Sequence, residues 1–435
     1  MMRMPRNASA LVVLAVLLLP ALAQGGGRLY MLSPNPPFWP DRSFPVPYNI
    51  NPDTADGNIA GSDPVQQFVD ATVAAFSTWE AIPTSRITFA RGPDVTDVLD
   101  RDPDDGINLI VFNGWAIVQG IPIPLPPGVL GVTNTVFDFT TGEMRGAAIT
   151  LNKDPLPDFA NPDWSTSGAP WTLDVQAVIL HEAGHLQGLC HSNVRNDTSG
   201  DLSGPPSNAA VMFPFIGGDV MDGRTPDPDD IAWHGFIYPS PSYGSVFGSI
   251  EGDVPFGSTM TGCAPPKGAN GAHVVARDLD DRLGGEPRMV VGTYSYRADG
   301  PLGRYRIPGL PPGEYGVWIE PLDGSPVSAL QINTRIQFTL DTRFPEDWYS
   351  GNDESGFEAL PNDPSSASPV TVAAGGRTTG IDIIVEEIVP GWCMNVVAAA
   401  RASHALRSAV ATMVVLLLPF LFLYLMKRVT AAKRQ

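Results

Sequence analysis

The sequence predicts an α+β domain over residues 44–240, an all-β sandwich domain over residues 244–388 and a C-terminal transmembrane helix. Three observations support this prediction. Helical and strand-like patterns alternate as far as Pro239, whereas from Gly244 onward only short alternating strands with glycine and proline turns are evident. A long uncharged apolar run lies near the C-terminus. A chain of 435 residues has room for two or three domains.

The N-terminus has the pattern of a secretory signal peptide over residues 1–23. A start with two arginines precedes an apolar run from Ala10 to Leu19, and the small-residue stretch Ala21-Leu22-Ala23 follows. This order of basic, apolar and small segments is typical of an export signal, and the run is short for a membrane span. A retained N-terminal anchor is the alternative. A proline-rich linker over residues 24–43 leads to the first domain.

The sequence pattern near the C-terminus predicts a membrane anchor. A juxtamembrane segment, residues 389–408, precedes 18 uncharged residues over 409–426. At ~1.5 Å per residue this helix reaches roughly 27 Å, close to the thickness of a hydrocarbon core. The basic tail over residues 427–435 places that end in the cytoplasm. We therefore expect the bulk of the chain to be extracellular or periplasmic, either anchored or released after C-terminal processing.

Composition and charge exclude some function classes. The net charge of −19 argues against nucleic acid as a partner, because a phosphate-binding face needs an excess of lysine and arginine. It is compatible with calcium binding by loop carboxylates, and a solvated acidic surface is the alternative. The three cysteines, Cys190, Cys263 and Cys393, allow at most one disulfide within the chain.

The first domain is predicted to contain three helices and several strands. Asp63 is expected to cap a helix that starts at Pro64, because apolar residues recur with helical spacing through Trp79. A second helix is expected from Leu173 to Gln187 and a third from near Asp227. Strands are predicted in RITFA from Arg86, INLIVF from Ile107, VLGVTNTVF from Val129 and AAITLN from Ala147.

The second domain is predicted to contain strands without helices. The strand-like stretches are GSVFGSIEGDV, GAHVVARDL, MVVGTYSY, GRYRIPGLPPGEYGVWIEPL and TTGIDIIVEE. Glycine and proline turns separate them, which is typical of a β-sandwich. The polar stretch over residues 347–369 is expected to be a long loop.

Three of the six histidines lie within one short stretch, ILHEAGHLQGLCHS, from Ile179 to Ser192. On a helix, His181 and His185 differ by about 40° around the axis and therefore lie on one face. Gly188 can adopt a left-handed conformation that ends the helix, so that His191 supplies a third nitrogen from the loop.

This pattern predicts a catalytic zinc site with one Zn²⁺ per chain. Three neutral imidazole nitrogens with an open fourth position are the ligand set of a catalytic zinc rather than a structural one. Glu182 follows the first histidine directly and is expected to act as general base. A helix with surface histidines and no metal is the alternative, which the full HExxHxxGxxH spacing on a predicted helix makes unfavourable.

The motif resembles that of the metzincin metallopeptidases. Ser192 after the third histidine is similar to the matrixin branch, and AAVMFPF resembles the matrixin Met-turn, with Met212 in the position of its methionine. TPDPDDIAWHGFIYP is similar to the C-terminal helix of that family, and AFSTWEAIPTSRITF to its first helix and strand. The resemblance covers roughly residues 44–239.

The resemblance implies a mixed twisted sheet with an active-site helix. It implies that His181, His185 and His191 bind the metal, that Glu182 is the general base and that Met212 forms a hydrophobic floor beneath the zinc. It also implies that the strand in GVLGVTNTV receives substrate as an added strand and that residues 213–218 line the pocket beyond the scissile bond.

The chain departs from the family pattern in several places. Animal matrixins hold a second zinc through further histidines, but outside the motif this domain has only His234. No propeptide cysteine is evident. Cys190 is expected to be a small buried thiol, although a thiolate beside His191 could bind metal. Calcium at DRDPDDG is compatible with the family, and a solvated turn there is the alternative. His273 and His404 are expected to be ordinary residues.

The second domain resembles carboxypeptidase-regulatory-like, transthyretin-like β-sandwiches, on the stretches GRYRIPGLPPGEYGVWIEPLDG and SPVTVAAGGRTTGIDIIVEE. Such modules are usually non-catalytic spacers or binding units. The function expected from the whole sequence is that of a membrane-tethered, zinc-dependent endopeptidase acting on proteins or peptides. Two alternatives remain open: a surface adhesin that binds through the sandwich, and an envelope structural protein whose peptidase only processes itself.

Overall fold

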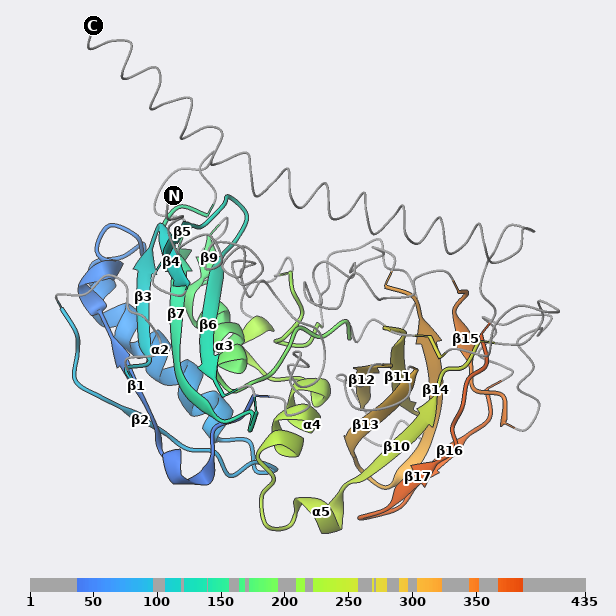
Figure 1. The fold of residues 1–435 in the computed structure, drawn as a ribbon. Helices are drawn as coiled ribbons and strands as arrows, with labels where there is room; N and C mark the ends of the chain where they lie inside the picture. The colour runs from blue at the N-terminus through green and yellow to red at the C-terminus, as the bar shows by residue number, and fades with distance from the viewer. Residues whose placement is uncertain are drawn as a thin grey trace, which may run out of the picture. The chain divides into compact units, whose positions relative to one another are not determined.

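The fold is described from a computed structural model of the chain (Figure 1). All the described residues belong to one compact unit, which comprises residues 1–257 and 267–386. The signal peptide, the juxtamembrane segment, the transmembrane helix and the basic tail predicted above lie outside the described residues, as do Cys263, Cys393 and His404. The structure describes residues 37–96, 106–118, 121–138, 140–155, 164–168, 172–194, 209–215, 222–256, 268–269, 271–279, 289–295, 303–322, 344–351 and 367–385.

The first half of this unit contains a five-stranded sheet in the order β2-β1-β3-β7-β6. The first four strands run parallel, and β6 alone runs antiparallel, beside β7. Strand β6 is therefore an edge strand of this sheet, and among the described residues it pairs with β7 alone. The strands are β1 (Val46–Ile50), β2 (Phe89–Arg91), β3 (Leu109–Asn113), β6 (Gly131–Phe137) and β7 (Met144–Asn152).

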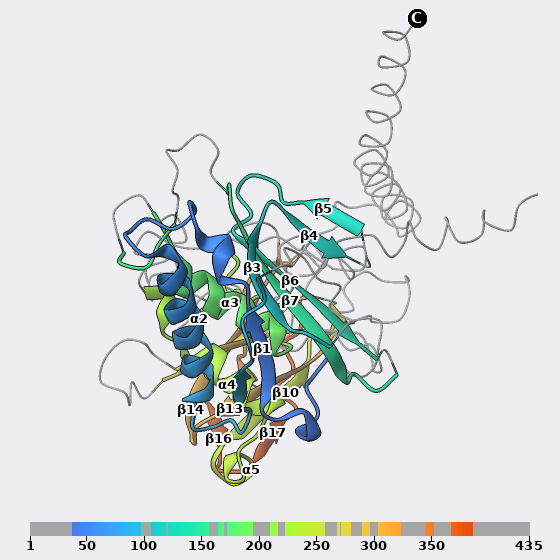
Figure 2. The same ribbon diagram turned by 90° about the vertical axis from the view of Figure 1, so that its left-hand side faces the viewer.

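Two helices, α2 (Pro64–Glu80) and α3 (Val175–Leu186), cover one face of this sheet (Figures 1 and 2). Asp63 caps α2 by accepting a hydrogen bond from the backbone N–H of Gln66, as the sequence predicts. The apolar stripe of α2 is buried between α3 and the sheet, with Trp79 fully enclosed. The indole of Trp79 donates a hydrogen bond to the carbonyl oxygen of Leu180 at 2.8 Å, which ties α2 to α3.

The predicted helices and strands of this half are confirmed to within a few residues. Strand β1, an inner strand of the sheet, was not predicted, and neither was a hairpin of β4 (Trp115–Val118) and β5 (Ile121–Pro124). The last part of the predicted linker packs on the domain, since Trp39 is buried and its indole donates to the carbonyl oxygen of Leu186 at 2.8 Å. Short elements complete this half: η1 (Asp41–Ser43), η2 (Pro52–Ala55), β8 (Trp164–Ser165), β9 (Leu173–Asp174) and η4 (Asp222–Arg224).

Helix α4 (Pro228–Ile237) follows, with Asp227 and Asp230 forming a capping box at its start. A helical turn, α5 (Tyr243–Val246), then leads into the strands, so the prediction of no helix from Gly244 onward was wrong by this one turn. The turn forms because the N–H groups of Val246 and Phe247 bond back to the carbonyls of Ser242 and Tyr243.

The second half is built from two sheets, in the orders β13-β10-β17 and β12-β11-β14-β15, with β16 pairing β14. Part of the stretch expected as a long loop is a strand, because Asp347 and Trp348 pair with β14. No helix in the described residues is long and apolar enough to cross a membrane. The strands are β10 (Gly248–Asp253), β11 (His273–Asp278), β12 (Val290–Tyr294), β13 (Arg304–Leu310), β14 (Gly313–Glu320), β15 (Asp347–Trp348), β16 (Val370–Val372) and β17 (Arg377–Thr379).

Candidate metal centre

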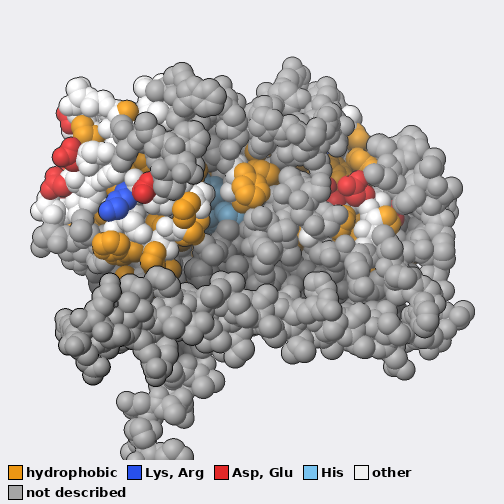
Figure 3. Space-filling model, turned by 90° about the horizontal axis from the view of Figure 1, so that it is seen from above, with side chains coloured by type: hydrophobic (Ala, Val, Ile, Leu, Met, Phe, Trp, Pro, Cys, Tyr) orange, Lys and Arg blue, Asp and Glu red, His pale blue; other side chains and the backbone are white. Residues whose placement is uncertain are grey.

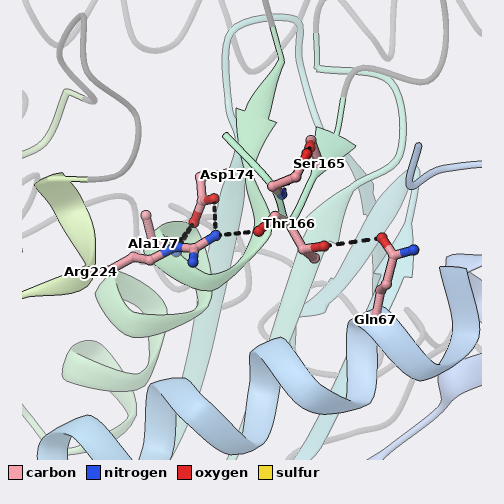
Figure 4. Close-up of polar contacts among 7 residues, drawn as sticks. Gln67, Ser165, Thr166, Asp174, Ala177 and Arg224 are labelled. Carbon is pink, nitrogen blue, oxygen red and sulfur yellow. Dashed lines mark hydrogen bonds and ion pairs between the residues drawn. The ribbon is translucent and has the colours of Figure 1, made fainter. Parts of the chain in front are cut away.

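The start of α3 is fixed by a buried ion pair (Figure 4). Asp174 caps the helix by accepting from the backbone N–H of Ala177 at 2.8 Å, and its side chain is fully buried. The guanidinium of Arg224 binds both oxygens of this carboxylate and also donates to the carbonyl oxygen of Thr166 at 2.6 Å. Because a buried carboxylate without partners is costly, Arg224 is what allows Asp174 to cap here.

The end of α3 is a Schellman motif. Gly188 has a left-handed φ of 90°, its N–H bonds to the carbonyl of His185, and the N–H of Leu189 bonds to the carbonyl of Gly184. A Cβ on Gly188 would lie 2.5 Å from the carbonyl oxygen of Pro37, so only glycine fits between the helix end and the N-terminal segment. The predicted left-handed turn is confirmed, and it directs the chain back toward the helix.

This turn brings the three motif histidines together. The ring centroids of His181, His185 and His191 are 4.8, 4.9 and 4.9 Å apart, close to an equilateral triangle. One ligand nitrogen from each ring lies within 4.8 Å of the others, and the Nε2 atoms of His181 and His191 are 3.0 Å apart. Among the described residues, this is the one group of three or more potential ligands that could hold a metal ion.

The backbone orients two of these rings. His181 Nδ1 lies 2.6 Å from the carbonyl oxygen of Val211, and His185 Nδ1 lies 2.9 Å from that of Leu189. Since a carbonyl only accepts, each Nδ1 carries the proton and each Nε2 keeps a lone pair for a metal. Burial lowers the pKa of His181 to about 4 and that of His185 to about 3, so both rings are neutral at pH ~7.

Glu182 is buried next to the edge strand. Its carboxylate oxygen Oε2 accepts from the Thr133 hydroxyl at 2.6 Å, and a Cβ on Gly131 would lie 2.8 Å from Oε1. Burial raises the pKa of this carboxyl to about 7, against the opposing effect of the Thr133 hydrogen bond. The Thr133 hydroxyl thus holds the Glu182 side chain against β6, and Gly131 leaves the space that this side chain occupies.

Met212 packs against α3 at Gly184, which lies between the first two histidines. A Cβ on Gly184 would lie 2.3 Å from the Met212 sulfur, so glycine is required for this close approach. The carbonyl of Met212 accepts from the N–H of Ser192 at 2.7 Å, which joins this turn to the loop carrying His191.

Two buried aspartates of α4 hold both loops. Asp230 accepts from the N–H groups of Val211 and Met212 at 2.7 and 3.1 Å, and Asp229 accepts from the Ser192 hydroxyl at 2.7 Å. Burial raises the pKa of Asp230 to about 6. Burial and then the neighbouring Asp230 charge raise the pKa of Asp229 to about 7.

The remaining candidates lie elsewhere. His234 is fully buried and donates through Nε2 to Gln187 Oε1 at 2.6 Å, while His273 bonds through Nδ1 to Glu320. Cys190 is buried, as expected for a small thiol. DRDPDDG lies outside the described residues except for its glycine.

The sequence did not reveal several residues that shape the centre. Thr133 and Gly131 have no signal beyond a strand pattern, and Arg224 lies in a loop far from Asp174 in sequence. Asp229 and Asp230 lie in the stretch that resembles the C-terminal helix of the family, but their hydrogen bonds depend on the tertiary fold.

The predicted pocket residues are only partly described. Phe213 is buried, Phe215 is 46% exposed, and residues 216–218 lie outside the described residues. Figure 3 shows histidine surface recessed between hydrophobic side chains on one face of the molecule.

The donor set fits a zinc ion. Because Nδ1 of His181 and Nδ1 of His185 each bond to a backbone carbonyl, both Nε2 atoms offer a lone pair toward the third ring, which is the arrangement that a cation needs. Three imidazoles, two of them oriented by backbone carbonyls, are the kind of ligand set that catalytic zinc takes in proteins.

The chain was also compared with known proteins. No protein-family model matches it, and no curated protein matches it in sequence.

Proposed function

We propose that the protein is a zinc-dependent endopeptidase, with His181, His185 and His191 as ligands and Glu182 as general base. The observation that carries the proposal is the triangle of three imidazoles beside a buried carboxylate on the same helix. A bare metal-binding or storage site would have no use for that carboxylate, which is buried at a cost in free energy.

The chemistry divides between the metal and Glu182. Zinc in such a site acts as a Lewis acid, which polarises a peptide carbonyl and lowers the pKa of a water to about 7. Glu182 accepts a proton from the water as its oxygen adds to the carbonyl carbon, and later delivers that proton to the leaving amine nitrogen. A carboxyl whose pKa burial raises to about 7 is suited to both transfers near neutral pH. The Thr133 hydroxyl orients the carboxylate through Oε2.

Strand β6 is the proposed binding edge for substrate. It pairs with β7 on one side only within the described sheet, so an extended peptide can add to its other side through backbone hydrogen bonds. Gly131 and Thr133 of this strand contact Glu182, which brings a peptide bound along β6 past the catalytic carboxylate. Backbone-directed binding of this kind suits unfolded or extended protein segments.

The proposed location is outside the cytoplasm. It depends on the predicted export signal over residues 1–23 and the predicted anchor over residues 409–426, both outside the described residues. Protease protection of the full chain in intact cells tests this part independently of activity.

The decisive experiment combines cleavage and metal content. The purified full chain is incubated with a mixture of unfolded proteins, and bound zinc is measured on the same sample. We expect one zinc per chain, cleavage that stops with a chelator, and no cleavage by Glu182→Gln, which still binds zinc. One zinc without cleavage would favour the adhesin alternative, and the absence of zinc would refute the metal centre.

A further inference from the structure

The loop that carries the third histidine contacts the second half of the molecule. Directly after His191, the side chains of Ser192, Asn193 and Val194 all have partners in α4 or in the sandwich strands. A sandwich that served as a spacer or as an independent binding unit would not need to reach into this loop.

Gly292 of strand β12 is the closest point of contact. Its N–H donates to Asp229 Oδ1 at 2.8 Å, and its carbonyl accepts from the Trp233 indole at 2.8 Å. The other oxygen of Asp229 accepts from Ser192, so one carboxylate joins the sandwich to the residue next to His191. A Cβ on Gly292 would lie 2.4 Å from His273 Nε2 and 2.7 Å from a methyl carbon of Val194, so there is no space for a larger residue.

A polar contact lies beside it. The Asn193 amide donates to Glu320 Oε1 of β14 at 2.9 Å, and His273 Nδ1 of β11 lies 2.7 Å from the same oxygen. Asn193 and His273 are buried, and the Glu320 side chain is 19% exposed. A hydrogen-bonded group of this kind fixes the direction of the loop more closely than apolar contact alone.

Apolar packing completes the contact. Val194 packs with Val275 and Val290 of the sandwich. Phe213, the residue after Met212, packs with Tyr294 and Leu322. Both chain segments that surround α3 at the metal centre therefore rest on sandwich side chains.

We infer that the β-sandwich is a positioning element of the metal centre, with Gly292 and Glu320 holding the loop that bears His191. The inference rests on the proposed metal centre, and it assigns to these two residues no contact with substrate. His181 and His185 are fixed by their own helix, whereas His191 lies on a loop whose conformation depends on what packs against it. The sandwich supplies that packing from more than 80 residues away in sequence, as the 127-residue separation of Asn193 and Glu320 illustrates.

The test uses the full chain and measures metal binding instead of activity. Zinc dissociation is followed with a chromophoric chelator, and the absorption spectrum of the Co²⁺-substituted protein reports the ligand geometry. We expect Gly292→Ala to release zinc about tenfold faster than the wild type, because changes to residues that orient metal ligands typically weaken metal binding by at least about that factor. We also expect the absorption bands of the Co²⁺ protein to shift.

Gly316→Ala is the matched control. Gly316 lies in β14 of the same sheet, where the atoms nearest to an added Cβ belong to Trp348 and Leu279, at 3.1 and 3.3 Å, and none belongs to the loop after His191. It should lower stability without changing the Co²⁺ spectrum or the rate of zinc release. The inference would be overturned if the two variants changed zinc release and the Co²⁺ spectrum equally. It would also be overturned if Gly292→Ala folded and both readouts matched the wild type.

A second pair of variants covers the case in which Gly292→Ala does not fold. Glu320→Ala removes the acceptor of the Asn193 amide, whereas Glu320→Gln keeps a carbonyl oxygen for it. We expect faster zinc release from Glu320→Ala and recovery in Glu320→Gln; no difference between them would count against the inference. A wild-type chain that binds no metal at all would instead refute the metal centre itself, so the two failures are distinguishable.

Discussion

Helices α3 and α4 are both short and largely buried, but their polar side chains have different partners. In α4, Asp229, Asp230 and His234 each bond to groups of the chain itself. In α3, the Nε2 atoms of His181 and His185 face the ring of His191, and Glu182 has a single side-chain partner, Thr133.

Under the proposed function, this difference separates polar residues with a structural role from those that would bind the metal. A buried polar group normally costs free energy unless it is hydrogen-bonded, and in α4 both buried carboxylates meet this rule within the protein, whereas His234 is bonded through Nε2 and not through Nδ1. In the motif half of α3, His181, Glu182 and His185 have partners as well, but there three imidazole nitrogens converge within 4.8 Å of one another, close enough to hold one metal ion. Even within α3 the two halves differ, because Asp174 at the start is fully satisfied by Arg224 and Ala177.

The largest expected effect is on activity, from Glu182→Gln. Glutamine keeps the shape and the Thr133 contact but accepts no proton, so kcat/KM should fall by about 10²–10⁴-fold. Zinc content should not change. The melting temperature should not fall, because a neutral amide costs less free energy to bury than a carboxylate does. Glu80→Gln, at the exposed end of α2, is the control and should retain full activity. Activity retained in Glu182→Gln would remove the basis for distinguishing the two helices.

The next effect is on stability, from Arg224→Ala. The variant leaves the fully buried Asp174 without its cation, which should cost about 3–5 kcal/mol of unfolding free energy in urea titrations. Arg86→Ala breaks an exposed pair with Asp41 and should cost no more than about 1 kcal/mol. Similar losses for both variants would show that the start of α3 is not held by this ion pair.

A smaller loss of stability is expected from Asp230→Ala. The N–H groups of Val211 and Met212 lose their acceptor, with a cost of about 1–3 kcal/mol. Asp230→Asn keeps one acceptor oxygen, so its free energy of unfolding should lie between those of Asp230→Ala and the wild type. An asparagine variant as unstable as the alanine variant would mean that the backbone hydrogen bonds are not the cause.

The smallest effect at neutral pH concerns His234. Burial lowers its pKa from 6.5 to about 3, so its contribution to stability is complete above 6.5 and is lost as the pH falls toward 3. In His234→Gln the unfolding free energy should fall less steeply with acid, by about 1.4 kcal/mol per pH unit for the one proton. Urea titrations of both proteins between pH ~7 and ~5 measure the two slopes. Parallel slopes would mean that His234 is already accessible to protons in the folded state.

Local features of the fold could be predicted from the sequence. The cap at Asp63, the left-handed Gly188 and the helical spacing of His181 and His185 depend on a few neighbouring residues. The inner strand β1 was missed, because PYNI within a proline-rich segment has no clear alternation, and its identity as a strand comes from pairing with β2 and β3.

The sequence by itself determined which atoms can meet a metal, because helix pitch and one glycine turn bring three imidazoles together within eleven residues. Only the tertiary structure decided how those atoms are held. Thr133, Arg224, Asp229 and Gly292 act on the centre from other elements. Their roles follow from close packing between segments distant in the chain, for which a single sequence carries no local signal.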